Sequence, residues 1–84
     1  MEKVSAVVAT LNNEGTIREC LDSLISNHVD ELILVDGGST DQTGEIAKTY
    51  RLTKFIEGVK GIARAKDLGW RLARFDLILY LDAD

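Results

Sequence analysis

Two aspartates, Asp82 and Asp84, come directly after a strongly apolar run, "LILYL", at residues 77–81. Carboxylate oxygens are hard ligands of the kind that Mg²⁺ and Mn²⁺ prefer. Magnesium is usually held by one or two carboxylates, while substrate phosphates complete its coordination shell. A pair spaced i, i+2 just past a strand suits this task, with one carboxylate on the metal and the other on a water or a sugar hydroxyl.

Two further polar segments, "TLNNE" at residues 10–14 and "DGGST" at residues 36–40, also follow short apolar runs. Together with the terminal pair they supply hydroxyls, amides and carboxylates, but no histidine or cysteine, so zinc is not indicated. Three aspartates would repel a bare phosphate. An anionic ligand such as a nucleoside diphosphate therefore requires the cation. The candidate groups are Thr10, Asn12, Asn13, Glu14, Asp36, Gly37, Gly38, Ser39, Thr40, Asp82 and Asp84.

Alternating apolar runs and amphipathic stretches predict the elements that carry these segments. The apolar runs predict strands over residues 4–9, 31–35, 52–56 and 75–81. Helical periodicity predicts helices over residues 17–25, 41–50 and 62–73. Thr16 with Glu19, and Ser39 with Gln42, fit capping boxes. The helix opening at Ser39 would then present free backbone N–H groups and a positive dipole end to an anion.

The order β-α-β-α-β-α-β predicts an α/β fold, a Rossmann-like three-layer α/β/α arrangement with a parallel sheet. Right-handed crossovers favour the strand order 3-2-1-4. Strands 1 and 4 are then neighbours at the point where the strand order reverses, and ligands bind outside the carboxyl ends of strands at such points. All three polar segments are expected on that edge.

Composition limits the class of protein. The 84 residues leave room for one domain, so we expect residues 1–84 to form a single domain. Ten basic against fourteen acidic residues give a net charge of −4, which argues against a nucleic-acid partner. No apolar stretch is long enough for a transmembrane segment, and no signal peptide is evident, so a cytoplasmic location is expected. "DGGSTDQTG" matches neither the P-loop nor the dinucleotide-binding pattern.

Four segments in order resemble a known family: "VVATLNNE", "LILVDGGSTDQT", "GVKGIARAKDLG" and "LYLDAD". The chain looks like the N-terminal, nucleotide-sugar-binding portion of a family 2 glycosyltransferase with the GT-A fold, ending at the Asp-x-Asp motif. The resemblance implies a hexosyltransferase-like enzyme that uses a UDP- or GDP-sugar and Mg²⁺ or Mn²⁺ to glycosylate an acceptor hydroxyl. It also implies that the chain is truncated, lacks the catalytic base and is inactive alone.

The resemblance also implies roles for individual residues. Residues 9–12 match the turn that cradles the base, and Asp36 matches an aspartate that contacts the nucleoside. Asp82 would meet the ribose or a metal-bound water, and Asp84 would bind the metal. Gly37 replaces a frequent base-reading aspartate. The expected nucleotide-sugar site comprises Ala9, Thr10, Leu11, Asn12, Glu14, Asp36, Gly37, Lys66 and Asp82, and the expected metal ligands are Asp84 and Asp82.

Two other classes of function remain open at this point. A phosphotransferase of the haloacid dehalogenase type also uses Asp-x-Asp, but after its first strand, where this chain has "VVATLNN". A non-catalytic module could associate with itself through the exposed edge of the fourth strand, giving a homo-oligomer. Among the single residues, Ser39 fits a helix cap, Cys20 fits core packing, and Arg64 with Lys66 fits a solvated helix face.

Overall fold

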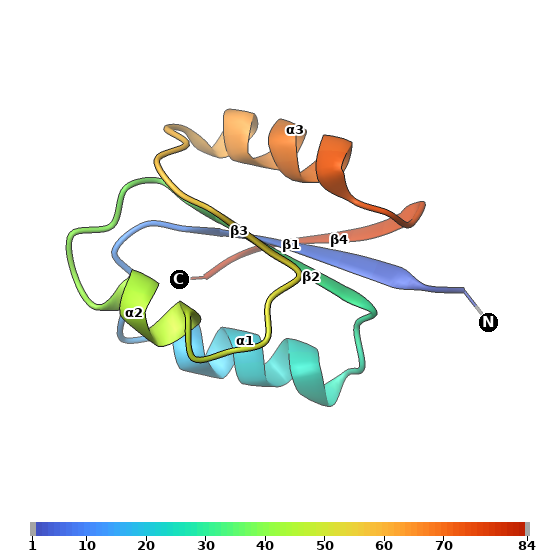
Figure 1. Ribbon diagram of the computed structural model, residues 1–84, viewed down its shortest axis with the longest axis horizontal. Helices are drawn as coiled ribbons and strands as arrows, with labels where there is room; N and C mark the ends of the chain where they lie inside the picture. Colours follow the sequence, from blue (N-terminus) through green and yellow to red (C-terminus); the bar gives the residue numbers. More distant parts are fainter. Residues whose placement is uncertain (1, 84) are drawn as a thin grey trace.

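The computed structural model describes residues 2–83, which form an α/β unit with the predicted alternation of strands and helices (Figure 1). All seven predicted elements are present in this range, most of them within two residues of the predicted bounds. They are β1 (Val4–Thr10), α1 (Ile17–Ser26), β2 (Glu31–Asp36), α2 (Thr43–Ala47), β3 (Lys54–Ile56), α3 (Ile62–Leu72) and β4 (Leu77–Asp82).

The four strands form one parallel sheet with the order β3-β2-β1-β4, which confirms the predicted topology. Thr10 at the end of β1 pairs with Asp36 at the end of β2, and Ala9 pairs with Asp82 at the end of β4. The three strand ends that precede the polar segments are therefore level with one another. Helix α3 covers one face of the sheet, and α1 with α2 covers the other (Figure 1).

The core consists of two clusters, one on each face of the sheet, because successive side chains of a strand point to opposite faces. On the α3 side, Val7, Ile33 and Val35 pack with Ala65. The other cluster joins alternate residues of β1 and β2 to α1 and includes Ala6, Val8, Ile17, Leu21, Leu32 and Leu34. Every residue of β2 is buried, as expected for a central strand with helices on both faces.

Gly69 sets how closely α3 approaches the sheet. A Cβ atom at this position would lie 2.3 Å from Cγ1 of Val7, far inside van der Waals contact. The absence of a side chain lets the helix backbone rest directly on β1. This close contact fixes the distance between α3 and the sheet at this point.

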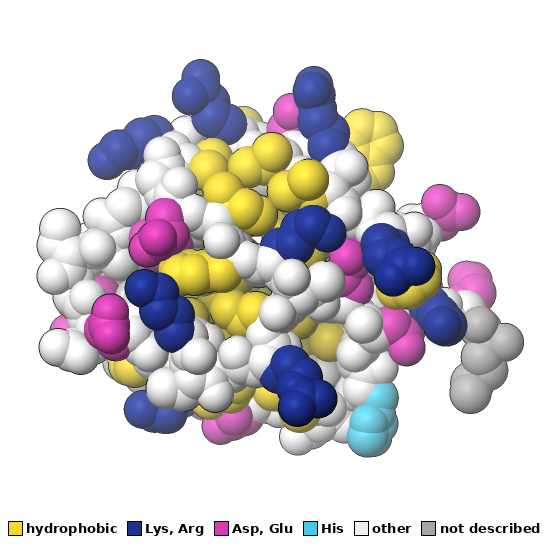
Figure 2. Space-filling model, in the orientation of Figure 1, with side chains coloured by type: hydrophobic (Ala, Val, Ile, Leu, Met, Phe, Trp, Pro, Cys, Tyr) yellow, Lys and Arg dark blue, Asp and Glu magenta, His cyan; other side chains and the backbone are white. Residues whose placement is uncertain are grey.

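The edge strands are less well covered than the centre of the sheet. In β4, Leu77 is 50% exposed and Leu79 is 44% exposed, because this strand pairs with β1 alone and lies beyond the helices. At the opposite edge, Figure 2 shows hydrophobic side chains gathered on the face below α3 and around β3, with lysines and arginines among them. Phe55 and Ile56 in β3 are half-buried.

Both predicted capping boxes are wrong. Thr16 is the N-cap of α1 but makes no side-chain capping bond, and α2 begins at Thr43 with Gln42 as its N-cap. The second helix covers five residues rather than 41–50, and Ser39 lies four residues before its first turn. Asp41 takes the place expected of Ser39: its carboxylate accepts hydrogen bonds from the Thr43 N–H at 2.9 Å and hydroxyl at 2.5 Å, at the start of the helix.

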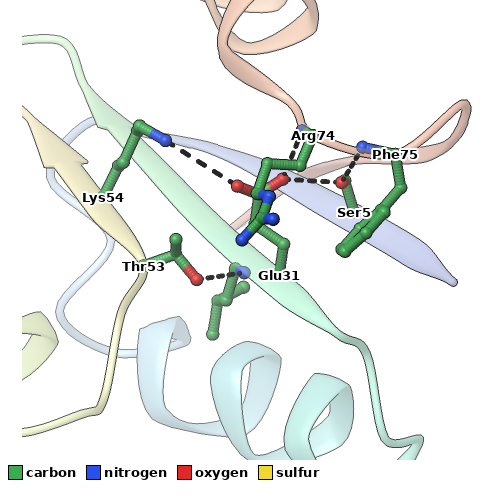
Figure 3. A network of polar contacts seen from close by, with 7 residues as sticks. Ser5, Glu31, Thr53, Lys54, Arg74 and Phe75 are labelled. Atoms are coloured by element: carbon green, nitrogen blue, oxygen red, sulfur yellow. Dashed lines mark hydrogen bonds and ion pairs between the residues drawn. The ribbon is translucent and has the colours of Figure 1, made fainter.

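A buried carboxylate ties the strands together at the edge opposite the polar segments (Figure 3). Glu31 is 2% exposed, and its Oε1 accepts hydrogen bonds from the Ser5 hydroxyl at 2.7 Å and the Arg74 N–H at 2.8 Å. Lys54 Nζ lies 3.8 Å from Oε2. Burial acts to raise the pKa of Glu31, but these hydrogen bonds and the nearby positive charges outweigh it, so the pKa lies below its ordinary value.

Within residues 2–83, no helix has the length and apolar character that crossing a membrane requires.

Candidate functional site

A cavity of about 190 Å³ opens at the edge where β1, β2 and β4 end. Its walls come from the strand ends, from the loop before α3 and from the first turns of α3. Most of its lining is apolar. Of the residues predicted for the nucleotide-sugar site, five line this cavity, namely Ala9, Thr10, Leu11, Gly37 and Asp82; the other lining residues are Asn13, Val35, Val59, Gly61, Ile62 and Ala65.

The turns after β1 and β2 are fastened to each other through Asn12. Its N–H donates to the Ser39 hydroxyl at 2.9 Å, and its Oδ1 accepts from the Thr40 N–H at 2.8 Å. Asn12 has φ of 53°, in the left-handed region that asparagine tolerates better than most residues. Asn12 and Ser39 therefore shape the wall of the site. The sequence predicts that the N–H groups following Ser39 are free to bind an anion. The N–H groups of Ser39 and Thr40 instead donate to Asp36 and Asn12.

Asn13 and Glu14 complete the connection between the two turns. Asn13 Oδ1 accepts from the Thr10 hydroxyl at 2.9 Å and from the Leu11 N–H at 2.8 Å, which fixes the cavity-lining turn. The backbone N–H of Glu14 donates to Asp41 Oδ2 at 3.3 Å, and its side chain is exposed outside the cavity lining. Contact between Glu14 and a ligand stays a prediction.

The Asp36 carboxylate holds the turn that follows β2. Asp36 is only 4% exposed, and its oxygens accept hydrogen bonds from the Gly38 N–H at 2.9 Å, the Ser39 N–H at 2.8 Å and the Ser39 hydroxyl at 2.6 Å. This is the turn chemistry typical of aspartate before glycine. Its structural role is therefore clear, and its predicted contact with a nucleoside stays a prediction.

Asp82 lies at the β4 end of the cavity with an exposed side chain. No donor or cation within residues 2–83 is bonded to its carboxylate, so both oxygens are available as hard ligands for a divalent cation. The strand end is held firmly, because the Ala83 N–H donates to the Ala9 carbonyl at 3.0 Å and the Thr16 hydroxyl donates to the Ala83 carbonyl.

Asp82 suits a metal site in which one protein carboxylate and the oxygens of a bound diphosphate hold the cation. This is the usual arrangement for magnesium. Asp84, the other predicted metal ligand, lies outside the described residues. Across residues 2–83, no group of three or more histidine, cysteine, aspartate or glutamate side chains could hold a metal by itself.

Lys66 lies on the exposed surface of α3 and does not line the cavity. Its predicted contact with a diphosphate stays a prediction. Lys60 was not among the predicted site residues; it does not line the cavity itself, but its neighbours Val59 and Gly61 both do. Its Nζ lies 3.3 Å from the point that a Cβ of Gly38 would occupy.

Comparison with known proteins identifies the class of protein. The family model described as Glycosyl transferase family 2 matches residues 5–84, and the chain belongs to this family. The uncharacterized glycosyltransferase EpsJ of Bacillus subtilis (strain 168) is 35% identical over 88 residues, which cover 96% of this chain and 26% of EpsJ. Glycosyltransferase GlyA of Streptococcus pneumoniae is 29% identical, with 99% of this chain and 13% of GlyA covered.

A solved structure gives the same assignment. Glucosyl-3-phosphoglycerate synthase from Mycobacterium tuberculosis, in complex with Mn²⁺, UDP and glucosyl-3-phosphoglycerate, superposes with a TM-score of 0.81 at 30% identity. The match covers 99% of this chain and 34% of the synthase. The family resemblance and the fold predicted from it are thus confirmed. The chain spans about a third or less of the length of each of these three proteins.

Proposed function

We propose that the protein is a glycosyltransferase that uses a nucleotide-diphosphate sugar, and that residues 1–84 form the domain that binds this donor. The observation that carries the proposal is the placement of the Asp82 carboxylate, which has no bonding partner among residues 2–83, beside an apolar cavity at the switch point of the sheet. The family assignment supports it, as does the structural similarity to a synthase solved with UDP and Mn²⁺.

The two ends of the cavity suit the two ends of a nucleoside diphosphate. The apolar walls, which include Leu11, Val35 and Ile62, offer contact to the flat faces of a base. Asp82 at the other end offers oxygens to Mg²⁺ or Mn²⁺. Gly37 follows β2 and Asp82 ends β4, with β1 between them, so the ends are separated by about 10 Å. We therefore propose that the ribose of the donor lies over the end of β1.

The residues of this chain bind and orient the donor in our proposal. The bound metal would supply Lewis-acid stabilisation of the diphosphate as leaving group. The interlocked turns around Asn12 and Asp36 keep the cavity wall rigid, so little ordering is needed when the donor binds. We place the acceptor site and the catalytic base outside residues 1–84, and we expect the isolated chain to be inactive. A UDP- or GDP-sugar as donor and a cytoplasmic location are further predictions.

The test is a titration of the chain with UDP and with GDP, in the presence and absence of Mn²⁺, followed by calorimetry. We expect binding that requires the metal and that Asp82→Asn weakens about tenfold or more, the scale of one lost charge-assisted contact. Asp76→Asn is the matched control, because Asp76 is also exposed but lies just before the opposite end of β4. Metal-independent binding, or equal effects of both variants, would refute the assignment of Asp82.

Self-association is a second candidate property, favoured by the exposed edge of β4. Leu77 and Leu79 are about half exposed, and within residues 2–83 the strand forms backbone pairs with β1 only. Analytical ultracentrifugation should then detect a dimer that Leu79→Lys dissociates. A monomer at every concentration would exclude it. The phosphotransferase alternative gains no support, because the end of β1 carries Ala9 and Thr10 where that class needs aspartate.

A further inference from the structure

We propose that Thr16 is a positioning residue for the metal site: its hydroxyl holds the Ala83 carbonyl, and this contact keeps the Asp82 carboxylate directed at the cavity. Thr16 acts through Asp82 and does not touch the cation itself. The inference rests on the proposed function, because it concerns how firmly the donor site holds its metal. The sequence pattern predicts only a helix cap at Thr16, so this role comes from the tertiary structure.

The first observation is that the Thr16 hydroxyl is not used to cap α1. A threonine at the N-cap usually accepts a hydrogen bond from an N–H group of the first helical turn. Thr16 is the N-cap of α1 but makes no such bond. Its hydroxyl instead donates to the carbonyl of Ala83, which is 67 residues away in the chain. The Asn13 carbonyl is farther from the hydroxyl, at 3.5 Å, so the single hydroxyl proton is assigned to Ala83.

The second observation is that Ala83 is held at three points. Its side chain is 1% exposed and packs in the core cluster on the α1 side of the sheet. Its N–H donates to the Ala9 carbonyl at 3.0 Å. Its carbonyl accepts the bond from Thr16. Of these three contacts, the bond from Thr16 is the one that fixes the carbonyl, and it ties the end of β4 to the start of α1.

The third observation is that Asp82 and Ala83 face opposite sides of the sheet. Successive side chains of an extended chain alternate in this way. Ala83 packs on the α1 side, whereas Asp82 lines the cavity on the α3 side with Ile62 and Ala65. Within the described residues, no hydrogen bond or ion pair fixes the Asp82 carboxylate. Its direction is therefore set by the backbone of residues 82–83, which Thr16 restrains.

The expected effect follows from how outer groups support a metal ligand. Partners that hold a ligand in place typically contribute about 10–100-fold to metal affinity when they bond the ligand directly. Thr16 holds the backbone of the following residue instead, through one hydrogen bond. We therefore expect a smaller contribution, about three- to tenfold in metal-dependent affinity.

The test is calorimetric titration of the chain in excess Mn²⁺ with UDP or GDP, whichever the parent chain binds more tightly. Thr16→Val keeps the shape of the side chain, removes the hydroxyl and should weaken binding about three- to tenfold. Thr16→Ser keeps the hydroxyl and should stay within about twofold of the parent chain. Thr49→Val is the matched control, because Thr49 is also exposed and its hydroxyl donates to the Ile46 carbonyl at 2.7 Å, outside the cavity lining.

A double-mutant cycle with Asp82→Asn distinguishes positioning from general support of the fold. If Thr16 acts through Asp82, adding Thr16→Val to Asp82→Asn should weaken binding by less than about twofold more, because the carboxylate that it directs is already gone. Additive losses would overturn the proposal. So would a Thr16→Val affinity equal to that of the parent chain, or a loss no larger than that of Thr49→Val.

Amide hydrogen exchange provides a measurement that needs no ligand. Thr16→Val should speed exchange of the Ala83 N–H severalfold while the amides of β2 keep their rates, because the loosening is local to the end of β4. Unchanged exchange at Ala83 would refute the restraint and the proposal with it. The parent chain tells the two levels apart: if it shows no metal-dependent nucleotide binding, the proposed function fails together with this inference, whereas normal binding by Thr16→Val overturns this inference alone.

Discussion

The contact between Gly69 and Val7 allows the sharpest prediction about packing. In Gly69→Ala, the new methyl would lie 2.3 Å from Val7 Cγ1, 3.0 Å from Cγ2 and 3.2 Å from Cβ. Val7 is 1% exposed in the central part of the sheet, and its β-branched side chain has little rotamer freedom. Helix α3 must therefore move away from β1, or β1 must distort.

The magnitude follows from two opposing effects. Overpacking of a core typically lowers the free energy of unfolding by about 1–3 kcal/mol. In the opposite direction, alanine in a helix is more stable than glycine by about 1 kcal/mol. We expect a net loss of about 2 kcal/mol in the free energy of unfolding. For a domain of this size, a loss of this magnitude lowers the melting temperature by about 10 °C.

Urea denaturation measures the effect, and Gly15→Ala is the matched control. A Cβ at Gly15 has no neighbour within 4 Å, so this variant should change stability by less than about 0.5 kcal/mol. In the background Val7→Ala, which removes the clashing methyls, Gly69→Ala should cost much less than alone. If Gly69→Ala were as stable as the parent chain or more so, helix propensity would outweigh packing, and the proposed seating of α3 on β1 would be refuted.

Three further predictions concern the turn, the cavity and the buried carboxylate. Asp36→Ala removes the acceptor of three hydrogen bonds and should lower the free energy of unfolding by about 2 kcal/mol, measured by urea denaturation, with Asp76→Ala as a neutral control. Gly37→Leu should fill the cavity and abolish nucleotide binding in calorimetry while the melting temperature changes by only a few degrees; unaltered binding would place the base elsewhere. Glu31 has a lowered pKa in the folded state, so its contribution is present above its unfolded pKa and is lost as the pH falls through the folded value. Glu31→Gln should therefore flatten the dependence of stability on pH between about pH 5 and 3, and an unchanged slope would contradict this assignment.

The sequence by itself determined the order of the elements and their arrangement, although not the length of α2 or the caps of α1 and α2. Short apolar runs such as residues 31–35 mark buried parallel strands, and the spacing of apolar residues marks the covering faces of α1 and α3. The alternation of strands and helices, with right-handed crossovers, leaves few topologies, and 3-2-1-4 is the one observed. The convergence of the three polar segments follows directly, because all carboxyl ends of a parallel sheet lie on one edge.

Tertiary structure decided what each polar side chain does once it reaches that edge. Ser39 reads as a helix cap from its local pattern, yet its hydroxyl bonds Asp36 and the N–H of Asn12, which is 27 residues away in the chain. Lys60 looks like an ordinary surface cation in the sequence, yet its ammonium lies 3.3 Å from the point that a Cβ of Gly38 would occupy, a contact between two loops that the pattern of residues does not show. The local pattern of apolar and polar residues determines where helices and strands form. A hydrogen bond between residues distant in the chain depends instead on strand register and loop geometry, to a fraction of an ångström. The periodicity of the residues carries no information on that geometry.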